Sequence, residues 1–304
     1  MTAGDNPRPP GRGTPAADYQ IDADLVRALL RDQHPDLADL AIAPAASGWD
    51  NAMFRLGETM SVRLPRRAVA AELLENEQRW LPTLAGRLPL PVPTPLRVGT
   101  PARVYPWHWS VLPWLDGVPA DLALLAADQG PVLAAFLRAL HTPAPSEAPF
   151  NRNRSVTLRS RSVMTEPQMA RVAARSDLIN DQISQIWSDA VEAEVDVGPA
   201  WIHGDLHARN LLSVDGRISG VIDWGDMARG DPATDLCSIW MLLPDMLSRR
   251  AAMDAYGLAS NLTWRRARGW AVAYGAVLMD AGAIDDPRLE AMGRLALERL
   301  IEGP

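Results

Sequence analysis

Three polar side chains in the second half of the chain have the types and spacing that phosphoryl transfer requires. Asp205 precedes Asn210 within residues 203–210 (HGDLHARN), and Asp223 follows within residues 221–225 (VIDWG). Phosphoryl transfer uses one carboxylate near the attacking hydroxyl, and a second carboxylate with an amide oxygen on the magnesium ion that bridges the phosphates. We expect Asp205 to take the first role, and Asn210 and Asp223 to hold Mg²⁺.

A hairpin can bring the two predicted metal ligands together. Residues 213–217 (SVDGR) have the composition of a tight turn between two apolar runs. The chain would then return along residues 218–222, which places Asp223 beside Asn210.

The two segments match H-x-D-L-x-x-x-N followed by D-x-G, the pattern of a kinase catalytic loop and its metal site. Residues 201–235 closely resemble the aminoglycoside phosphotransferase family, which shares the protein-kinase-like fold. The resemblance implies an α+β, bilobal structure with a small antiparallel-sheet N-lobe and a larger, mostly helical C-lobe. It also implies transfer of the γ-phosphate of ATP or GTP to a small-molecule hydroxyl. In that family, an aspartate at the position of Asp235 braces the catalytic loop.

Simpler explanations exist for the single residues. Asp205 alone could cap a turn, and Asp223 alone could end a strand. His203, Asp205 and His207 also form H-x-D-x-H, which a metal hydrolase could use. A zinc site draws three or four ligands, however, and the other three of the five histidines have no ligand-like spacing. The three phosphotransfer roles in order therefore favour the kinase-like interpretation.

The chain contains no lysine, and all 30 basic residues are arginine. The resembled family carries V-x-K where this chain has residues 61–64 (SVRL), so Arg63 is the candidate for the phosphate-binding cation. Arginine keeps its charge but is longer and planar, so the geometry must adjust. The family's partner glutamate is best matched by Glu77, which precedes an apolar group; Glu72 and Glu75 are the alternatives.

A hairpin before the catalytic loop resembles the nucleotide-covering loop of the family. Strands are predicted at residues 52–56 and 59–64, after a polar turn that contains Gly48 in place of a full G-x-G-x-x-G. Ser47 and Asn51 could offer donors to phosphate there. Taken alone, this segment would be an ordinary hairpin turn.

The expected organisation is a disordered tail at residues 1–17, an N-lobe at 18–112 and a C-lobe at 113–304. Apolar spacing predicts helices at residues 22–33, 68–85, 121–127, 130–141, 167–191, 233–243, 260–279 and 287–301. Further strands are predicted at residues 40–43, 96–98 and 104–105, with residues 112–117 as the hinge between lobes. The arginine-rich residues 151–161 are typical of a solvated stretch. The tryptophans around the hinge favour a core over a base-stacking platform.

Composition excludes several classes of protein. A net charge of −7 and a pI near 5.3 argue against a nucleic-acid partner. The single cysteine, Cys237, excludes an internal disulfide and suits a reducing compartment. No apolar run approaches the roughly 20 residues that span a bilayer. Together with the absence of a signal pattern at the N-terminus, this predicts a cytoplasmic protein with no membrane partner.

The acceptor is open at this stage. Three alternatives remain. The acceptor could be an aminoglycoside-type or related antibiotic, or it could be a metabolic sugar or amino alcohol. The protein could also be a pseudokinase that binds nucleotide and has no acceptor. Drug-modifying relatives line their pocket with C-lobe acids, for which the candidates here are Asp254, Asp280, Asp285, Asp286 and Glu290. A protein substrate is not expected, because residues 223–231 are too few for an activation loop.

Overall fold

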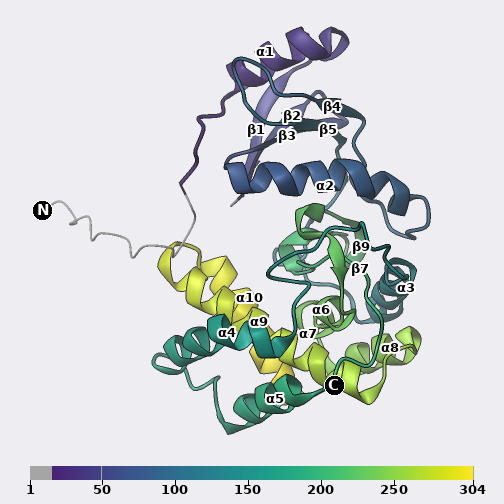
Figure 1. Ribbon diagram of the computed structural model, residues 1–304, viewed down its shortest axis with the longest axis vertical. Helices are drawn as coiled ribbons and strands as arrows, with labels where there is room; N and C mark the ends of the chain where they lie inside the picture. The colour runs from purple at the N-terminus through teal and green to yellow at the C-terminus, as the bar shows by residue number, and fades with distance from the viewer. Residues whose placement is uncertain (1–15, 49, 304) are drawn as a thin grey trace, which may run out of the picture.

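A five-stranded antiparallel sheet forms the N-lobe, in the order β1-β2-β3-β5-β4 (Figure 1). Its strands are β1 (Ile42–Ser47), β2 (Asn51–Leu56), β3 (Met60–Pro65), β4 (Arg97–Gly99) and β5 (Trp109–Pro113). The computed structural model describes residues 16–48 and 50–303. Most of the predicted tail and Trp49 therefore lie outside the described residues.

Alternation of buried and half-buried residues explains the sheet. In β2, Ala52, Phe54 and Leu56 are buried while the residues between them are partly exposed, which is the period-two pattern of a strand with one covered face. The register pairs Phe54 with Val62 and Met53 with Arg63. This pairing fixes the position of Arg63 in the middle of the sheet.

Two helices cover the N-lobe sheet (Figure 1). Helix α1 (Ala23–Gln33) begins at Asp22, whose side chain accepts the backbone N–H of Leu25. Its Val26, Leu29 and Leu30 belong to the same hydrophobic core as strands β2, β3 and β5. Helix α2 (Ala68–Ala85) lies between the sheet and the C-lobe and continues through Pro82 to Ala85. Glu77 and Arg63 therefore lie at the junction of the lobes.

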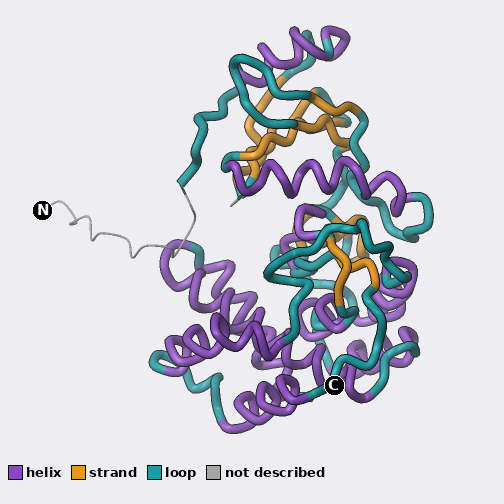
Figure 2. Tube along the Cα trace, in the orientation of Figure 1, coloured by secondary structure: helices purple, strands orange, loops and turns teal. Residues whose placement is uncertain are grey.

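The C-lobe is mostly helical (Figure 2). Its helices are α3 (Gly130–Leu140), α4 (Leu158–Ala173), α5 (Asp181–Glu192), α6 (Ala233–Leu236), α7 (Ser238–Leu242), α8 (Met246–Tyr256), α9 (Asn261–Asp285) and α10 (Pro287–Glu302). Helix α9 packs against α4, α5, α6 and α10. It is buried along most of its length, including Trp270 and Tyr274, so it forms the centre of this lobe.

Short strands carry the catalytic segment at the top of the C-lobe, beside α2 (Figure 2). They are β6 (Val118–Pro119), β7 (Ala200–Ile202), β8 (Leu211–Val214), β9 (Arg217–Val221) and β10 (Ala228–Gly230). Strand β8 pairs with β6 and β9, while β7 pairs with β10. The described residues also contain four 3₁₀ turns: Pro35–Leu37, Ala127–Gln129, Ala208–Asn210 and Trp224–Asp226. Within the described residues, no helix is both long and apolar enough to cross a membrane.

The helix predicted at residues 121–127 is wrong. The segment forms turns, and a 3₁₀ turn begins only at Ala127. Backbone hydrogen bonds tie the segment to the β8–β9 hairpin instead: Ala120 N donates to Leu211 O, and Ala126 N donates to Gly216 O, both at 2.9 Å. These backbone N–H groups therefore donate to the hairpin and not to carbonyl groups within a helix.

The single helix predicted at residues 167–191 is two helices. Helix α4 begins at Leu158 and runs through Pro167, and α5 begins after Asn180. The Asn180 side chain accepts the N–H of Ile183 at 3.0 Å, which makes it the N-cap of α5. A capping residue inside a continuous apolar pattern thus marks the break.

Two strand predictions also change. Residues 104–105 form no strand, because the chain turns tightly there and closes a lone bridge between Ala102 and Tyr105. Strand β1 begins two residues later than predicted and extends to Ser47, whose backbone pairs with Ala52. The turn before β2 is therefore shorter than the sequence pattern indicates.

Candidate active site

The turn that carries Asp205 begins directly after β7, and its backbone N–H groups are hydrogen-bonded to the Asp235 carboxylate. Gly204 has φ +83°, in the left-handed region that glycine adopts most easily. A Cβ at this position would lie 2.6 Å from the backbone oxygen of Asp226. The fully buried Asp235 carboxylate accepts the N–H groups of His203 at 2.6 Å and Gly204 at 2.8 Å. The bracing that the family resemblance implied for Asp235 is confirmed.

His203 fixes the catalytic loop through both ring nitrogens. Its Nε2 donates to the carbonyl of Ile222 at 3.0 Å, and its Nδ1 accepts the N–H of Asp205 at 3.2 Å. The first contact ties the loop to the segment that ends in Asp223. His203 therefore supports the loop through hydrogen bonds.

Three donors surround the Asp205 carboxylate. Arg154 Nη2 donates to Oδ1 at 2.6 Å, Asn210 Nδ2 donates to Oδ2 at 3.2 Å, and His207 Nε2 lies 3.4 Å from Oδ2. Burial alone would raise the pKa of the Asp205 carboxyl, but the charges of His207 and Arg154 outweigh it and hold the pKa below its usual range. Asp205 is therefore an ionised acceptor of hydrogen bonds at neutral pH.

The β8–β9 hairpin brings Asn210 and Asp223 to neighbouring positions, as predicted. Asp215 and Gly216 form its turn with positive φ angles. After the hairpin, Ile222 N donates to the backbone oxygen of Asn210 at 2.9 Å. Asp223 then adopts φ 60° and ψ 70°, which is uncommon for a non-glycine residue. This conformation leaves half of its side chain exposed.

Arg63 connects the N-lobe to this segment. Its Nη1 donates to Glu77 at 2.7 Å and its Nη2 donates to Asp223 at 2.6 Å. With its amide oxygen turned toward Arg63, Asn51 accepts from Nη2 at 2.9 Å. Burial lowers the pKa of the Arg63 guanidinium, but the Glu77 and Asp223 carboxylates more than restore it. The structure thus selects Glu77 over Glu72 and Glu75 as the partner of Arg63.

The predicted metal ligands suit magnesium chemically. A carboxylate oxygen and an amide oxygen are the hard donors that Mg²⁺ prefers, usually with waters and substrate phosphates completing its shell. The Asn210 amide nitrogen points at Asp205, so its oxygen is directed elsewhere. Asp223 engages Arg63 through Oδ1 and is half exposed. Both residues can therefore offer an oxygen to a cation.

Sequence reasoning missed Arg154. Residues 151–161 were expected to be solvated, but the Arg154 side chain is only 15% exposed and contacts Asp205, and Arg161 is buried. Arg154 Nη2 also lies 3.7 Å from Asp226. Burial raises the pKa of the Asp226 carboxyl, against the opposing charge of Arg154. The run of arginines was the only available signal, because no spacing relates it to the catalytic loop.

Three of the five candidate acids of the C-lobe, Asp280, Asp286 and Glu290, pair with arginines. Arg209 makes two hydrogen bonds of 2.6 Å to Asp286, which joins the catalytic loop to the start of α10. Arg171 pairs with Asp280, and Arg175 pairs with Glu290. A pocket of bare carboxylates at these positions is therefore not what the structure presents.

The remaining predicted residues have simpler surroundings. Ser47 ends β1, and only its backbone is described. Trp109 is fully buried in the N-lobe core, whereas Trp114 is partly exposed beneath the Arg55 guanidinium at 4.0 Å. The core interpretation of the tryptophans holds for Trp109. Cys237 is buried, as expected of a small hydrophobic residue.

The zinc alternative finds no support in residues 16–48 and 50–303. His203 and His207 engage the backbone and Asp205 as described. No group of three or more His, Cys, Asp or Glu side chains converges there to hold a metal ion.

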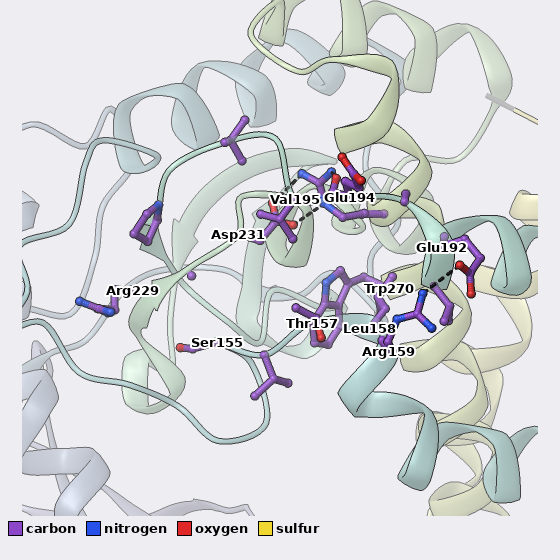
Figure 3. Close-up of a pocket in the computed structure, with 18 of the residues that line it drawn as sticks. Ser155, Thr157, Leu158, Arg159, Glu192, Glu194, Val195, Arg229, Asp231 and Trp270 are labelled. Carbon is purple, nitrogen blue, oxygen red and sulfur yellow. Dashed lines mark hydrogen bonds and ion pairs between the residues drawn. The ribbon is translucent and has the colours of Figure 1, made fainter.

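A cavity of about 420 Å³ lies away from these residues (Figure 3). Trp270, Leu158 and Asp231 line it, and the Arg159–Glu192 ion pair lies at one side. Neither Asp205 nor either predicted metal ligand lines this cavity. Residues 155–159 contribute to its wall and directly follow Arg154, which contacts Asp205.

Comparisons with known proteins agree with this geometry. The viomycin phosphotransferase of Streptomyces vinaceus is 40% identical over 82 residues, which is 25% of this chain and 28% of that protein. The match therefore spans less than a third of that relative. The GDP complex of aminoglycoside 2'-phosphotransferase-IIIa superposes with a TM-score of 0.66 and 18% identity, over 92% of this chain and 98% of that one. Macrolide 2'-phosphotransferase type I superposes with a TM-score of 0.58 and 21% identity, over 92% and 98%.

These structural likenesses establish the protein-kinase-like fold, with its antiparallel-sheet N-lobe and helical C-terminal region. The model of the phosphotransferase enzyme family (APH) matches residues 41–270, which include the predicted catalytic, nucleotide-binding and metal-binding residues. The chain belongs to the phosphotransferase enzyme family.

Proposed function

We propose that this protein transfers the γ-phosphate of ATP or GTP to a hydroxyl of a small molecule, with an aminoglycoside-type or related antibiotic as the preferred acceptor class. The proposal rests on one arrangement: Asp205 contacts Asn210, the segment that ends in Asp223 is hydrogen-bonded to the backbone of Asn210, and Asp223 pairs with Arg63, which also pairs with Glu77. Family membership supports the reaction type.

In the proposed reaction, the acceptor oxygen attacks the γ-phosphorus, and the bond from that phosphorus to the β–γ bridging oxygen breaks. The bonding electrons leave with the nucleoside diphosphate, and the hydroxyl proton passes to Asp205. Because the transition state is loose in most analyses, the main task of Asp205 is to orient the hydroxyl, and it takes the proton late. A carboxylate held in its ionised form by neighbouring cations suits this role.

Asn210 and Asp223 would hold Mg²⁺, which would neutralise charge on the phosphates when bound. Arg63 would contact the phosphates in place of the family's lysine. Its contacts with Glu77 and Asn51 orient the guanidinium before a nucleotide arrives. The choice between ATP and GTP stays part of the proposal.

The acceptor class rests on the names of similar proteins. They include a viomycin phosphotransferase, an aminoglycoside 2'-phosphotransferase and a macrolide 2'-phosphotransferase. A protein substrate is disfavoured, because the residues between Asp223 and Asp231 are used by a 3₁₀ turn and by β10, which pairs with β7. A nucleic-acid partner is disfavoured by the net charge of −7. A cytoplasmic location, with a single buried cysteine, belongs to the same proposal.

Two alternative functions can be distinguished from the proposed one by experiment. A metabolic kinase would phosphorylate a sugar or an amino alcohol in preference to a drug. A pseudokinase would bind nucleotide without turnover, but the assembled Arg63–Glu77 pair makes this the weaker alternative.

The experiment incubates the protein with MgATP or MgGTP and an acceptor panel of viomycin, an aminoglycoside, a macrolide, simple sugars and amino alcohols. Mass spectrometry then detects the gain of one phosphoryl group on the acceptor. We expect a drug from the first three classes to be phosphorylated by the parent and far more slowly by Asp205→Asn. Transfer confined to a sugar or an amino alcohol would replace the proposal with the metabolic alternative. Nucleotide binding without any transfer would establish a pseudokinase.

A further inference from the structure

The shortest polar contact of the Asp205 side chain comes from outside the catalytic loop. Arg154 lies 51 residues upstream, between α3 and α4, and donates to Oδ1 at 2.6 Å. The donors within the loop, Asn210 and His207, are both on Oδ2 at 3.2 and 3.4 Å. A guanidinium is planar and directional, so its contact fixes the orientation of a carboxylate as well as neutralising its charge. Arg154 is the only one of these three groups that holds Oδ1.

Arg154 is itself held on several sides. Its guanidinium carbon lies 4.7 Å from the centre of the Tyr274 ring, and the Tyr274 hydroxyl donates to the backbone oxygen of Gly204. The backbone oxygen of Arg154 accepts from Thr234 Oγ1 at 3.3 Å. A Cβ at Gly204 would lie 3.3 Å from Arg154 Cγ and 2.6 Å from the backbone oxygen of Asp226. The catalytic turn is therefore packed around the arginine stem.

We propose that Arg154 is a positioning residue of the transfer reaction, which acts through Asp205 by holding its carboxylate in one orientation toward the acceptor oxygen. The inference rests on the proposed function. Without Arg154, the two remaining donors both act on Oδ2, and the contact that holds Oδ1 is lost, so the orientation of the carboxylate is less restrained. A misplacement of about 1 Å can cost on the order of 100-fold in rate, so loss of this contact affects kcat more than nucleotide affinity.

The test compares Arg154→Met, which removes the donors and keeps much of the stem, with Arg154→Lys, which keeps a charge without the fork. Arg152→Met is the matched control, because Arg152 is exposed on the same loop. The readouts are formation of nucleoside diphosphate from MgATP and MgGTP, with water alone and with the acceptor panel, together with nucleotide Kd and Tm. We expect kcat to fall about 100-fold in Arg154→Met, with Kd unchanged. Arg154→Lys recovers part of the loss, and Arg152→Met matches the parent.

A double-mutant cycle separates positioning from a structural role. If Arg154 acts through Asp205, Arg154→Met has little further effect in an Asp205→Asn background, because the group it positions has already been disabled. The same fractional loss in both backgrounds would overturn the inference, as would a parent-like kcat in Arg154→Met. A lower Tm with lost nucleotide binding would assign Arg154 to the fold instead.

Hydrolysis of the nucleotide by water can be measured without an acceptor, so the positioning inference can be tested even if the proposed function fails. If the parent hydrolyses nucleotide but phosphorylates no acceptor, the proposed function fails, and the cycle is still measured on hydrolysis. If acceptors are phosphorylated equally by the parent and Arg154→Met, only the positioning inference fails. A parent that neither hydrolyses nor transfers would overturn both.

Discussion

Arg63 and Asp223 lie 160 residues apart in the sequence and are joined by a hydrogen-bonded ion pair of 2.6 Å. The contact connects the middle strand of the N-lobe sheet to the end of the β8–β9 hairpin. Because Arg63 also donates to the fully buried Glu77, one guanidinium links the sheet, helix α2 and the C-lobe. The residue proposed to contact the phosphates is therefore bonded directly to a residue proposed to hold the metal.

Replacing Arg63 should impair both nucleotide binding and turnover. Hydrogen bonds to charged groups contribute about 1.5–3 kcal/mol, so we expect Arg63→Ala to raise the nucleotide KM roughly ten- to hundredfold and to lower kcat. Arg63→Lys should keep partial activity, because an ammonium retains the charge but not both contacts. Steady-state kinetics with varied MgATP and MgGTP measure the effect.

The control for Arg63 is Arg66→Ala, because Arg66 donates to the backbone oxygen of Gly48 and not to Glu77. Removing one partner of a buried ion pair destabilises a protein by roughly 3–5 kcal/mol, so thermal unfolding must accompany the kinetics. A folded Arg63→Ala variant with parent-like turnover would transfer the predicted role to Arg66 or Arg67.

Magnesium-dependent nucleotide binding should require Asp223 and Asn210. Removing a carboxylate ligand from a dication takes away a donor that no neighbouring side chain obviously replaces. Asp223→Ala should abolish turnover and keep its fold, since this side chain is half exposed. Nucleotide titrations with and without Mg²⁺ measure the loss, and Asp215→Ala on the nearby turn is the control. Magnesium-dependent affinity that is unchanged in both Asp223→Ala and Asn210→Ala would remove these residues from the metal site.

Asp205 should be essential for rate and dispensable for nucleotide affinity. Asp205→Asn keeps the shape and one acceptor oxygen but loses the charge and basicity. General-base assistance is commonly worth about 100- to 10,000-fold, so we expect kcat to fall at least about 100-fold while the nucleotide Kd stays nearly unchanged. Separate titrations of binding and product formation decide the matter. A near-parent kcat would exclude Asp205 from the chemistry.

The Arg209–Asp286 contact should make stability depend on pH at the acid end. Hydrogen bonds from Arg209 hold the pKa of the Asp286 carboxyl below its ordinary value. Because this pKa is lower in the folded state, the ionised carboxylate stabilises the fold at pH values above the unfolded-state pKa of about 3.9. This stabilisation is lost as the pH falls through the folded-state pKa. Since the pair is partly exposed, we expect about 1 kcal/mol or less at neutral pH.

The variant for this test is Asp286→Asn, which can still cap α10 by accepting the N–H of Leu289. The difference in Tm between parent and variant should be constant from pH 7 to about pH 5 and should shrink below about pH 4. A difference that does not change over this range would show that the carboxylate charge contributes nothing to stability.

Local patterns were sufficient for several parts of this protein. The Asp215–Gly216 turn predicted the hairpin that returns the chain beside Asn210, and Asn210 contacts Asp205 within one loop. Asp22 at the start of α1 and Pro131 at the start of α3 likewise marked helix ends. These features depend on turns, caps and backbone preferences that act within a few residues. A short stretch of sequence contains all the groups involved.

Tertiary structure decided the contacts between distant segments. The sequence favoured Glu77 as the partner of Arg63 but left Glu72 and Glu75 open, and the packing of α2 against the lobe junction decided for Glu77. Arg154 resembled a solvated arginine until the fold placed its loop beside Asp205 and Tyr274. Such contacts depend on how helices and sheets pack against one another. Local sequence patterns indicate only whether a residue is compatible with the helix, strand or loop that contains it. The candidate catalytic residues could thus be proposed from local spacing, whereas the groups that contact them depended on the whole fold.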